Sequence, residues 1–248
     1  MIVCRSNSEI ERIREAGRIV AQALLLAGKV IEPGISTLEI DAYVEARIKK
    51  QKGRPAFKGY RGFPAATCIS IDEVVVHGIP GTRRLRAGQI VGVDIGVELN
   101  GYFADAAATF AVAEVAGDVK KLMETGQAAL AAGINMAVGG NHLYDISAEV
   151  QRVAEGAGYS VVRDFVGHGI GRDLHEEPQI PNYAQTGRGP KLNPGMVLAL
   201  EPMVNMGGYE VEVMKDQWTV VTLDRRESVH YEHTIVITEG EPEILTVL

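Results

Sequence analysis

The segment 89–112 constrains the fold of this chain most strongly, because it predicts a β-hairpin that carries acidic residues. Two apolar stretches flank Asn100-Gly101, and an Asn-Gly pair in this setting is a strong signal for a two-residue hairpin turn. With that turn, the numbers of facing residues sum to 201, so Asp94 faces Ala107. Asp105 lies two residues before Ala107 on the same face of its strand. The two aspartates are therefore predicted to be diagonal neighbours, with Cα atoms about 7–8 Å apart.

Acidic residues also interrupt two other apolar segments. Glu201 follows the run MVLAL, and Glu232 precedes HTIVIT. A carboxylate in a buried strand is costly unless it is paired or binds a metal. A single residue of this kind is more often a surface or ion-paired carboxylate, but four in otherwise apolar strands favour a shared site. Oxygen ligands with an imidazole suit Mn, Fe, Co or Zn, and an acid-rich set suggests two metal ions.

Two histidines lie seven residues apart in the segment FVGHGIGRDLHEEP, at positions 168 and 175. This spacing could place both on one face of a helix. Gly167, Gly169 and Gly171 make a helix unfavourable, since each costs about 1 kcal/mol relative to alanine. From the residues alone, His168 and His175 could both bind a metal, or one of them could, or neither.

The rest of the chain predicts an α+β fold with an internal duplication. Ser8 and Glu11 form a capping box for a helix that ends near Lys29, and Ser36 and Glu39 form one for a helix that ends near Gln51. The apolar stripe of the first helix consists of Ile10, Ile13, Val20, Leu24 and Ala27. Two more helices are predicted over 118–137 and 142–158, and strands over 66–71, 73–79, 160–167, 196–204, 218–223, 231–238 and 242–248.

Two helices followed by strands occur twice, which predicts a single domain, 1–248, with pseudo-repeats at about 8–112 and 118–240. A shift of 105 positions aligns several identical residues and supports the duplication weakly. The natural ligand site of such a domain is the cleft between its halves. The segment 181–195 is expected to be a long surface loop.

Composition narrows the classes of function. The net charge of −7 argues against binding to nucleic acid. Cys4 and Cys68 are too few for a disulfide framework, which favours a reducing, cytoplasmic setting. Near the N-terminus the sequence shows no signal peptide and no apolar run long enough for a membrane span. A soluble enzyme for small or peptide substrates is compatible with these features.

Five motifs occur in the order and spacing of type I methionine aminopeptidases. They are EVVVHGIP, VGVDIGVELNGYFADAA, VGHGIGRDLHEEP, LALEPMVN and YEHTIVIT. The resemblance covers essentially the whole chain, and five motifs in register are far more specific than any one of them. It implies the pita-bread fold, in which two related halves with a central, mainly antiparallel sheet enclose a dinuclear metal site.

The resemblance implies a role for each acidic residue. Asp105 and Glu232 would bridge two divalent metal ions, and Asp94 would chelate one of them. His168 and Glu201 would complete the other. A metal-bridging water or hydroxide would attack the scissile carbonyl, and Glu201 would also carry a proton to the leaving amine. The identity of the metal is left open among Co, Mn, Fe and Zn.

The same resemblance implies the residues that face the substrate. His175 would stabilise charge on the scissile carbonyl, and His77 would contact the leaving-group side. The pocket for the methionine side chain would consist of Tyr60, Phe63, Cys68, Leu174 and Trp218. Leu174 and Phe57 depart from the residues that many relatives carry, so the shape of this pocket is open. His230 and His233 are expected to pack or to support the site.

The implied activity is removal of the N-terminal methionine from peptides and nascent chains, with a small second residue preferred. The enzyme would be a cytoplasmic monomer that works close to the ribosome and binds neither nucleic acid nor membrane. Prolidases and aminopeptidase P share the fold but carry a further N-terminal domain, and type II methionine aminopeptidases carry an insertion between His175 and Glu201. A non-catalytic binding protein of the same fold is the remaining alternative.

Overall fold

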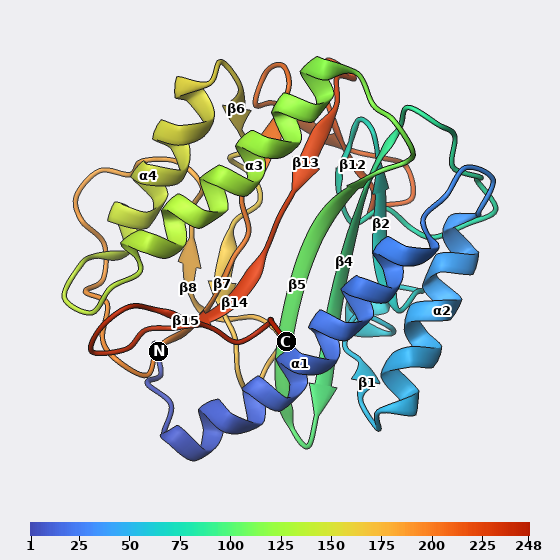
Figure 1. The fold of residues 1–248 in the computed structure, drawn as a ribbon. Helices are drawn as coiled ribbons and strands as arrows, with labels where there is room; N and C mark the ends of the chain where they lie inside the picture. The colour runs from blue at the N-terminus through green and yellow to red at the C-terminus, as the bar shows by residue number, and fades with distance from the viewer.

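The computed structural model describes all 248 residues and contains two pairs of helices. The first pair is α1 (Asn7–Val30) and α2 (Thr37–Lys50), and the second is α3 (Gly117–Met136) and α4 (Leu143–Gly156). A 3₁₀ turn, η1, spans Tyr60–Gly62. In Figure 1 the two pairs lie over the strands, α1 and α2 toward one side and α3 and α4 toward the other. The four predicted helices are confirmed.

The strands form four sheets, and all their pairings are antiparallel. The first sheet contains β1 (Arg54–Pro55), β2 (Thr67–Ile71), β4 (Ile90–Leu99) and β5 (Tyr102–Ala111). The second contains β6 (Ser160–Val161), β10 (Met203–Asn205) and β13 (Ser228–His230), and the third contains β3 (Val74–Val76), β11 (Val211–Val213) and β12 (Val220–Thr222). The fourth contains β7 (Gly167–Gly169), β8 (Glu176–Ile180), β9 (Val197–Leu200), β14 (His233–Val236) and β15 (Glu243–Ile244).

Each helix pair covers its own sheets. Helix α1 packs on β4 and β5, and α3 packs on β9, β10 and β13. The two halves meet where β5 runs beside β14, and there the Thr234 hydroxyl donates to the Asp105 carbonyl oxygen at 2.8 Å. This seam lies between the helix pairs (Figure 1) and brings strands from both halves to one place.

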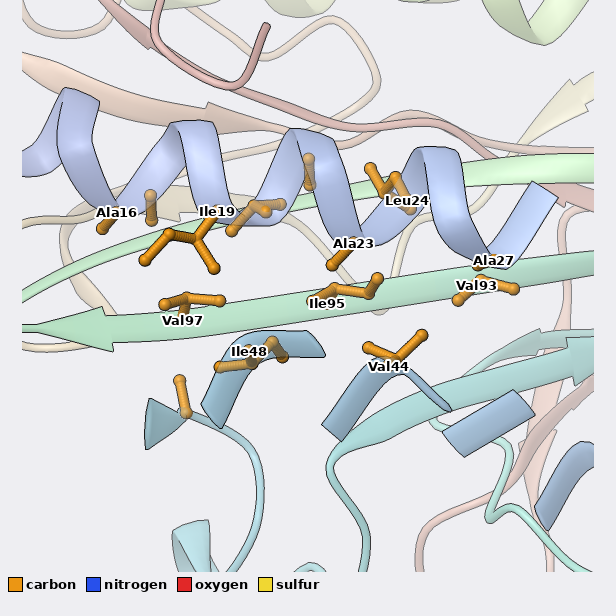
Figure 2. Close-up of a cluster of buried hydrophobic side chains, with 14 of the residues drawn as sticks. Ala16, Ile19, Ala23, Leu24, Ala27, Val44, Ile48, Val93, Ile95 and Val97 are labelled. Atoms are coloured by element: carbon orange, nitrogen blue, oxygen red, sulfur yellow. The ribbon is translucent and has the colours of Figure 1, made fainter. Parts of the chain in front are cut away.

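The core of the first half explains why α1 lies so close to its sheet. The predicted stripe is buried throughout: Ile10, Ile13, Val20, Leu24 and Ala27 are all at most 9% exposed. Figure 2 shows alanines of α1 together with side chains of α2 around Val93, Ile95 and Val97 of β4. Small residues on the helix permit this close approach, and the branched β4 side chains fill the space between the two helices.

The start of α1 differs from the prediction. The capping pair is Ser6 and Glu9, with the Glu9 carboxylate accepting from the Ser6 backbone N–H at 3.1 Å, and not Ser8 and Glu11. Glu11 instead forms an ion pair with Arg14 on the helix surface. Both pairs match the same Ser-x-x-Glu pattern, so the sequence does not separate them. The second capping box, Ser36 with Glu39, is confirmed.

The register of the central hairpin agrees with the prediction. Asp94 pairs with Ala107, and Leu99 pairs with Tyr102 across Asn100-Gly101, where both residues have positive φ. Other strands are shorter than expected. The predicted strand 160–167 ends at Val161, and 196–204 is broken between Leu200 and Met203, where Pro202 lacks the N–H that a continuous ladder needs.

Strand β8 was not predicted, because Glu176–Ile180 is polar and contains a proline. The segment 181–195 contains no helix or strand, as expected for a loop. Cys4 and Cys68 are both free thiols, one exposed and one buried. None of the helices is long and apolar enough to cross a membrane.

Candidate metal and substrate site

One pocket, with an empty volume of about 680 Å³ out to its open mouth, contains every predicted site residue. Of its fourteen lining residues, twelve are the site residues predicted from the sequence. The other two are Phe57, which the sequence marked only as a departure from relatives, and Arg61. The twelve are Tyr60, Phe63, Cys68, His77, Asp94, Asp105, His168, Leu174, His175, Glu201, Trp218 and Glu232.

Five of these residues form what we call the floor: Asp94, Asp105, His168, Glu201 and Glu232. Strand register brings them together. Asp94 and Asp105 come from the paired strands β4 and β5, and His168 of β7 pairs with Ala199 of β9. Leu200 pairs with His233, so Glu201 and Glu232 extend from the same end of β9 and β14.

The distances in the floor suit a shared ion. The His168 Nε2 atom lies 3.5 Å from an oxygen of Asp105 and 3.5 Å from an oxygen of Glu201. One ligand atom each from Asp105, His168 and Glu232 lie within 4.8 Å of one another. These separations leave room for a cation between the atoms, whereas they are too long for good hydrogen bonds.

The electrostatics of the floor also call for a cation. Burial raises the pKa of Asp94, Glu201 and Glu232 well above the usual carboxyl values, and the neighbouring carboxylates raise it further. Burial raises the pKa of Asp105 to about 6. One oxygen of Asp94 is buried with no hydrogen-bond partner. Because like charges at this range cannot all stay ionised without compensation, the donor set fits a divalent metal.

His168 is oriented as a ligand by its backbone neighbour. Its Nδ1 atom lies 2.9 Å from the Gly169 carbonyl oxygen, to which an N–H would donate. That tautomer leaves Nε2 unprotonated and turned toward Asp105 and Glu201. Burial lowers the pKa of His168 to about 4, which keeps the ring neutral. Gly169 is required here, because a Cβ would lie 2.2 Å from the Glu177 carbonyl oxygen.

Four polar residues above the floor form what we call the rim: Tyr60, Arg61, His77 and His175. The His175 ring lies 4.3 Å from the His168 ring, centre to centre. On its other side it stacks on Tyr60 at 5.2 Å, and its Nδ1 atom is 2.9 Å from the Tyr60 hydroxyl. Burial, followed by the nearby His168, lowers the pKa of His175 to about 4. His175 therefore stands beside the floor without belonging to it.

His77 adopts a backbone conformation that non-glycine residues rarely show. Its φ is +59°, in the left-handed region, and the following Gly78 lies so close to β2 that a Cβ would be 2.1 Å from the Ile69 carbonyl oxygen. The ring packs edge-on against Phe165 and Trp218. Such strain concentrates at functional sites, where the surrounding structure holds a side chain in one position.

Apolar side chains form what we call the wall of the pocket: Phe57, Phe63, Cys68, Leu174 and Trp218. Phe63, Cys68 and Leu174 are at most 5% exposed. Phe63 and Trp218 meet edge-to-face with ring centres 5.1 Å apart. Burial and the neighbouring acidic residues raise the pKa of the Cys68 thiol, so it remains a small apolar group.

Arg61 was given no site role from the sequence, and His230 was expected only to pack or to support the site. Arg61 lines the pocket, although the sequence shows it only as one polar residue between glycines. His230 places Nε2 3.7 Å from an oxygen of Glu201, and that nitrogen is buried with no hydrogen-bond partner. His233 is bonded instead to the Thr246 hydroxyl at 2.8 Å, in agreement with a packing role.

The fold and the site define a class of protein. Residues 11–239 match metallopeptidase family M24, so the chain belongs to this family, and membership implies use of a divalent metal. A prolidase structure from Pyrococcus horikoshii, at 24% identity and a TM-score of 0.79, covers 99% of this chain and 64% of that chain and shares the pita-bread fold.

Within this family, the chain belongs with the methionine aminopeptidases. It is 49% identical over 248 residues to methionine aminopeptidase of Clostridium perfringens, covering all of both chains. It is 50% identical over 246 residues to methionine aminopeptidase 1 of Bacillus subtilis, covering 99% of each. The crystal structure of methionine aminopeptidase from Thermotoga maritima matches with a TM-score of 0.98 at 45% identity, over 100% of both chains. The resemblance drawn from the motifs is confirmed, as is the α+β pita-bread fold.

Proposed function

We propose that this enzyme removes the N-terminal methionine from peptides and nascent chains and prefers a small second residue. The observation that carries the proposal is the convergence of four carboxylates, three histidines and an apolar wall in one pocket, where Asp105, His168 and Glu232 are buried with their ligand atoms close together. The ligand set supports two divalent ions held by Asp94, Asp105, His168, Glu201 and Glu232. Bound divalent metal would supply the positive charge that polarises a peptide carbonyl and lowers the pKa of water.

Glu201 is the proposed proton carrier. Its carboxylate faces His168 with one oxygen and His230 with the other. It lines the pocket beside the other acidic residues, where a carboxylate can accept a proton from water and release it to a leaving group. Glu201 would take a proton from the attacking water and deliver it to the leaving amine.

His175 is the proposed donor to the scissile carbonyl. If the Tyr60 hydroxyl donates to Nδ1, the proton of the neutral ring sits on Nε2 and is available to an oxygen that gains charge. His77 would contact the substrate on the leaving-group side. Its ring is half-buried, and burial lowers its pKa, so it acts as a neutral hydrogen-bonding group.

The wall is the proposed pocket for the methionine side chain. Aromatic rings and a thiol suit a flexible thioether, which makes favourable contacts with ring edges. Phe57 packs on the cluster of Phe63 and Cys68, and the buried Leu174 packs in the core beside Tyr60. Relative to the family pattern, the pocket gains the ring of Phe57 and, with Leu174, lacks another ring. These two differences affect how tightly the pocket binds the methionine side chain.

The wider setting is proposed on the same basis. The chain would act as one catalytic domain, 1–248, with the two pseudo-repeats 8–112 and 118–240. It would work as a cytoplasmic monomer, close to the ribosome, without binding nucleic acid or membrane. Its helix pairs and free cysteines are compatible with this setting.

Hydrolysis of a Met-Ala-Ser peptide by protein with defined metal content tests the proposal. The enzyme is expected to release free methionine, with activity lost on chelation and restored by divalent Co, Mn, Fe or Zn. A fully metal-loaded protein that leaves the peptide intact would favour the non-catalytic binding protein.

A further inference from the structure

Arg61 differs in charge from everything else that lines the pocket. The lining contains four carboxylates and three histidines, and Arg61 is its one permanent cation. The side chain is exposed, at the mouth rather than at the floor. A peptide substrate has a positive amine at the end that enters the pocket and carboxylates only farther along its chain. A cation at the mouth therefore matches the charge of the part of the peptide that remains outside.

The backbone holds Arg61 in a conformation that arginine rarely adopts. Its φ is 49° and its ψ is 22°, between Gly59 at φ 87° and Gly62 at φ 92°. The turn is closed by Gly62 N–H donating to the Gly59 carbonyl at 3.2 Å and by Phe63 N–H donating to the Tyr60 carbonyl at 2.9 Å. Glycine or asparagine would fit this left-handed position with less strain. The arginine is therefore held over the pocket despite a local cost.

The charge of Arg61 is also free of a protein partner, unlike that of its basic neighbours. Arg54 forms an ion pair with Glu98 at 3.0 Å, and Lys58 forms one with Glu45 at 2.9 Å. Arg61 makes no ion pair, and its guanidinium lies over the Tyr60 ring, 5.3 Å from the ring centre. The same Tyr60 ring also stacks on the His175 ring. The guanidinium is thus held against the ring on which His175 stacks, with its donors unused.

The shape of the pocket sets the path of the peptide. The wall is closed by the buried Phe63 and Cys68, whereas His175 and Arg61 are exposed. A peptide whose first side chain fills the closed end must leave past His175 toward the mouth. The ring centres of His175 and Tyr60 are 5.2 Å apart, and the Arg61 guanidinium carbon lies 5.3 Å from the Tyr60 ring centre. Since an extended chain advances about 3.3 Å per residue, Arg61 is within reach of the second or third residue beyond the scissile bond.

We propose that Arg61 binds a carboxylate carried by the peptide two or three residues beyond the scissile bond. In a short peptide this group is the C-terminal carboxylate, and in a longer chain it is an aspartate or glutamate side chain. The inference rests on the proposed function and adds a charge preference to it. An exposed pair of this kind contributes about 0.2–1 kcal/mol, so the preference is about 1.4- to 5-fold at low salt.

Two pairs of peptides separate the two sources of the carboxylate. Met-Ala-Ser with a free C-terminus is compared with its C-terminal amide, and an amidated heptapeptide with aspartate at position three is compared with the same peptide carrying asparagine. For the wild-type enzyme we expect kcat/KM to be about 1.4- to 5-fold higher for the carboxylate member of each pair. The difference should lie in KM and fall as salt screens the charges.

Variants of Arg61 and a matched control complete the test. Arg61→Asn, which suits the left-handed backbone, should abolish the preference, Arg61→Lys should retain part of it, and Arg61→Glu should reverse it. Lys58→Gln, which removes a nearby positive charge that is paired with Glu45, should leave it unchanged. Equal kcat/KM within both pairs for the wild type, or a preference that survives in Arg61→Asn, overturns the inference while the proposed function stands. Failure of the metal-loaded wild type to cleave any of the peptides is a different result, which overturns both.

Discussion

The floor and the rim of the pocket are built in different ways. Floor residues lie in or directly beside paired strands, and the ladder hydrogen bonds of β4 with β5 and of β9 with β14 fix their positions. Rim residues all lie outside the strands: Tyr60 and Arg61 are in the turn η1, His77 directly follows β3, and His175 directly precedes β8. Two of them, Arg61 and His77, have positive φ. Rigid strands suit ligands that must meet one ion, whereas loops suit groups that contact a variable substrate. Substitutions in the two regions should therefore have different consequences.

The largest effect is expected in the floor, at Glu201. Glu201→Ala removes both a metal ligand and the proposed proton carrier. Turnover of Met-Ala-Ser should fall by at least about 10³-fold, and metal content should fall with it. Steady-state kinetics and metal analysis of the same preparation measure both. Near-normal turnover in this variant would remove Glu201 from the mechanism.

The rim should show a smaller effect of another kind. His175→Ala should lower kcat by about 10²–10³-fold, the usual cost of losing one donor to a developing oxyanion. KM should change much less. Because His175 only neighbours His168, the variant should keep its metal. A variant that retained wild-type kcat would contradict the proposed role of His175.

The floor carboxyl groups should make the stability of the fold depend on pH only when the metal is removed. Burial raises the pKa of its carboxyl groups, that of Asp105 to about 6 and that of Glu232 well above its usual value. A carboxyl group with a raised pKa stabilises the fold below its unfolded pKa, and this stabilisation is lost as pH rises through the folded pKa. The neutral histidines have lowered pKa values, so the stability that they contribute is fully present above about pH 6.5. It does not change as pH rises further.

Asp105 is mostly ionised above its pKa of about 6, so above pH 6.5 the loss of stabilisation comes from carboxyl groups whose pKa is raised further, such as Glu232. The melting temperature of the metal-free protein should therefore fall as pH rises above about 6.5. Added divalent metal should raise it, and more strongly at pH 8.5, because fewer protons compete for the ligands. The His175→Ala variant, in which the floor is intact, should show the same pattern. A melting temperature that stays constant with pH in the metal-free protein would contradict this view of the floor.

The smallest effect is expected at Tyr60. Tyr60→Phe keeps the stacked ring but removes the 2.9 Å hydrogen bond to His175. A hydrogen bond of this kind contributes about 0.5–1.5 kcal/mol, so kcat should fall about 2- to 10-fold. Metal content should stay unchanged. A loss as large as that of His175→Ala would mean that Tyr60 itself contacts the reacting group.

The same contrast explains how much the sequence could predict. The Asn100-Gly101 turn fixes the register of the hairpin, so the relation of Asp94 to Asp105 follows from counting. The rim is different, because the bond between Tyr60 and His175 joins positions 115 residues apart. No local pattern specifies that contact, and the family resemblance assigned both residues to the substrate site without predicting a bond between them. Arg61 was missed for the same reason, since a polar residue between two glycines is typical of any surface turn.

Short strands mark the other limit of sequence-based prediction. Strand β8 follows His175 directly, yet its polar sequence lacks an apolar period, and it forms because β7 offers a partner. The break between β9 and β10 at Pro202 exposes Glu201 to the pocket. Periodicity predicts which residues are buried more reliably than where a strand ends, since tertiary contacts decide the ends.

The central claim is that the floor binds metal and the rim binds substrate, and metal content per chain tests it most directly. Wild type, Asp105→Asn and His175→Ala are prepared without added metal, equilibrated with the same concentration of one divalent ion, and analysed by atomic emission. We expect the His175→Ala variant to bind as much metal as the wild type and the Asp105→Asn variant to bind much less. Loss of metal in His175→Ala, or full metal content in Asp105→Asn, would contradict the division between floor and rim.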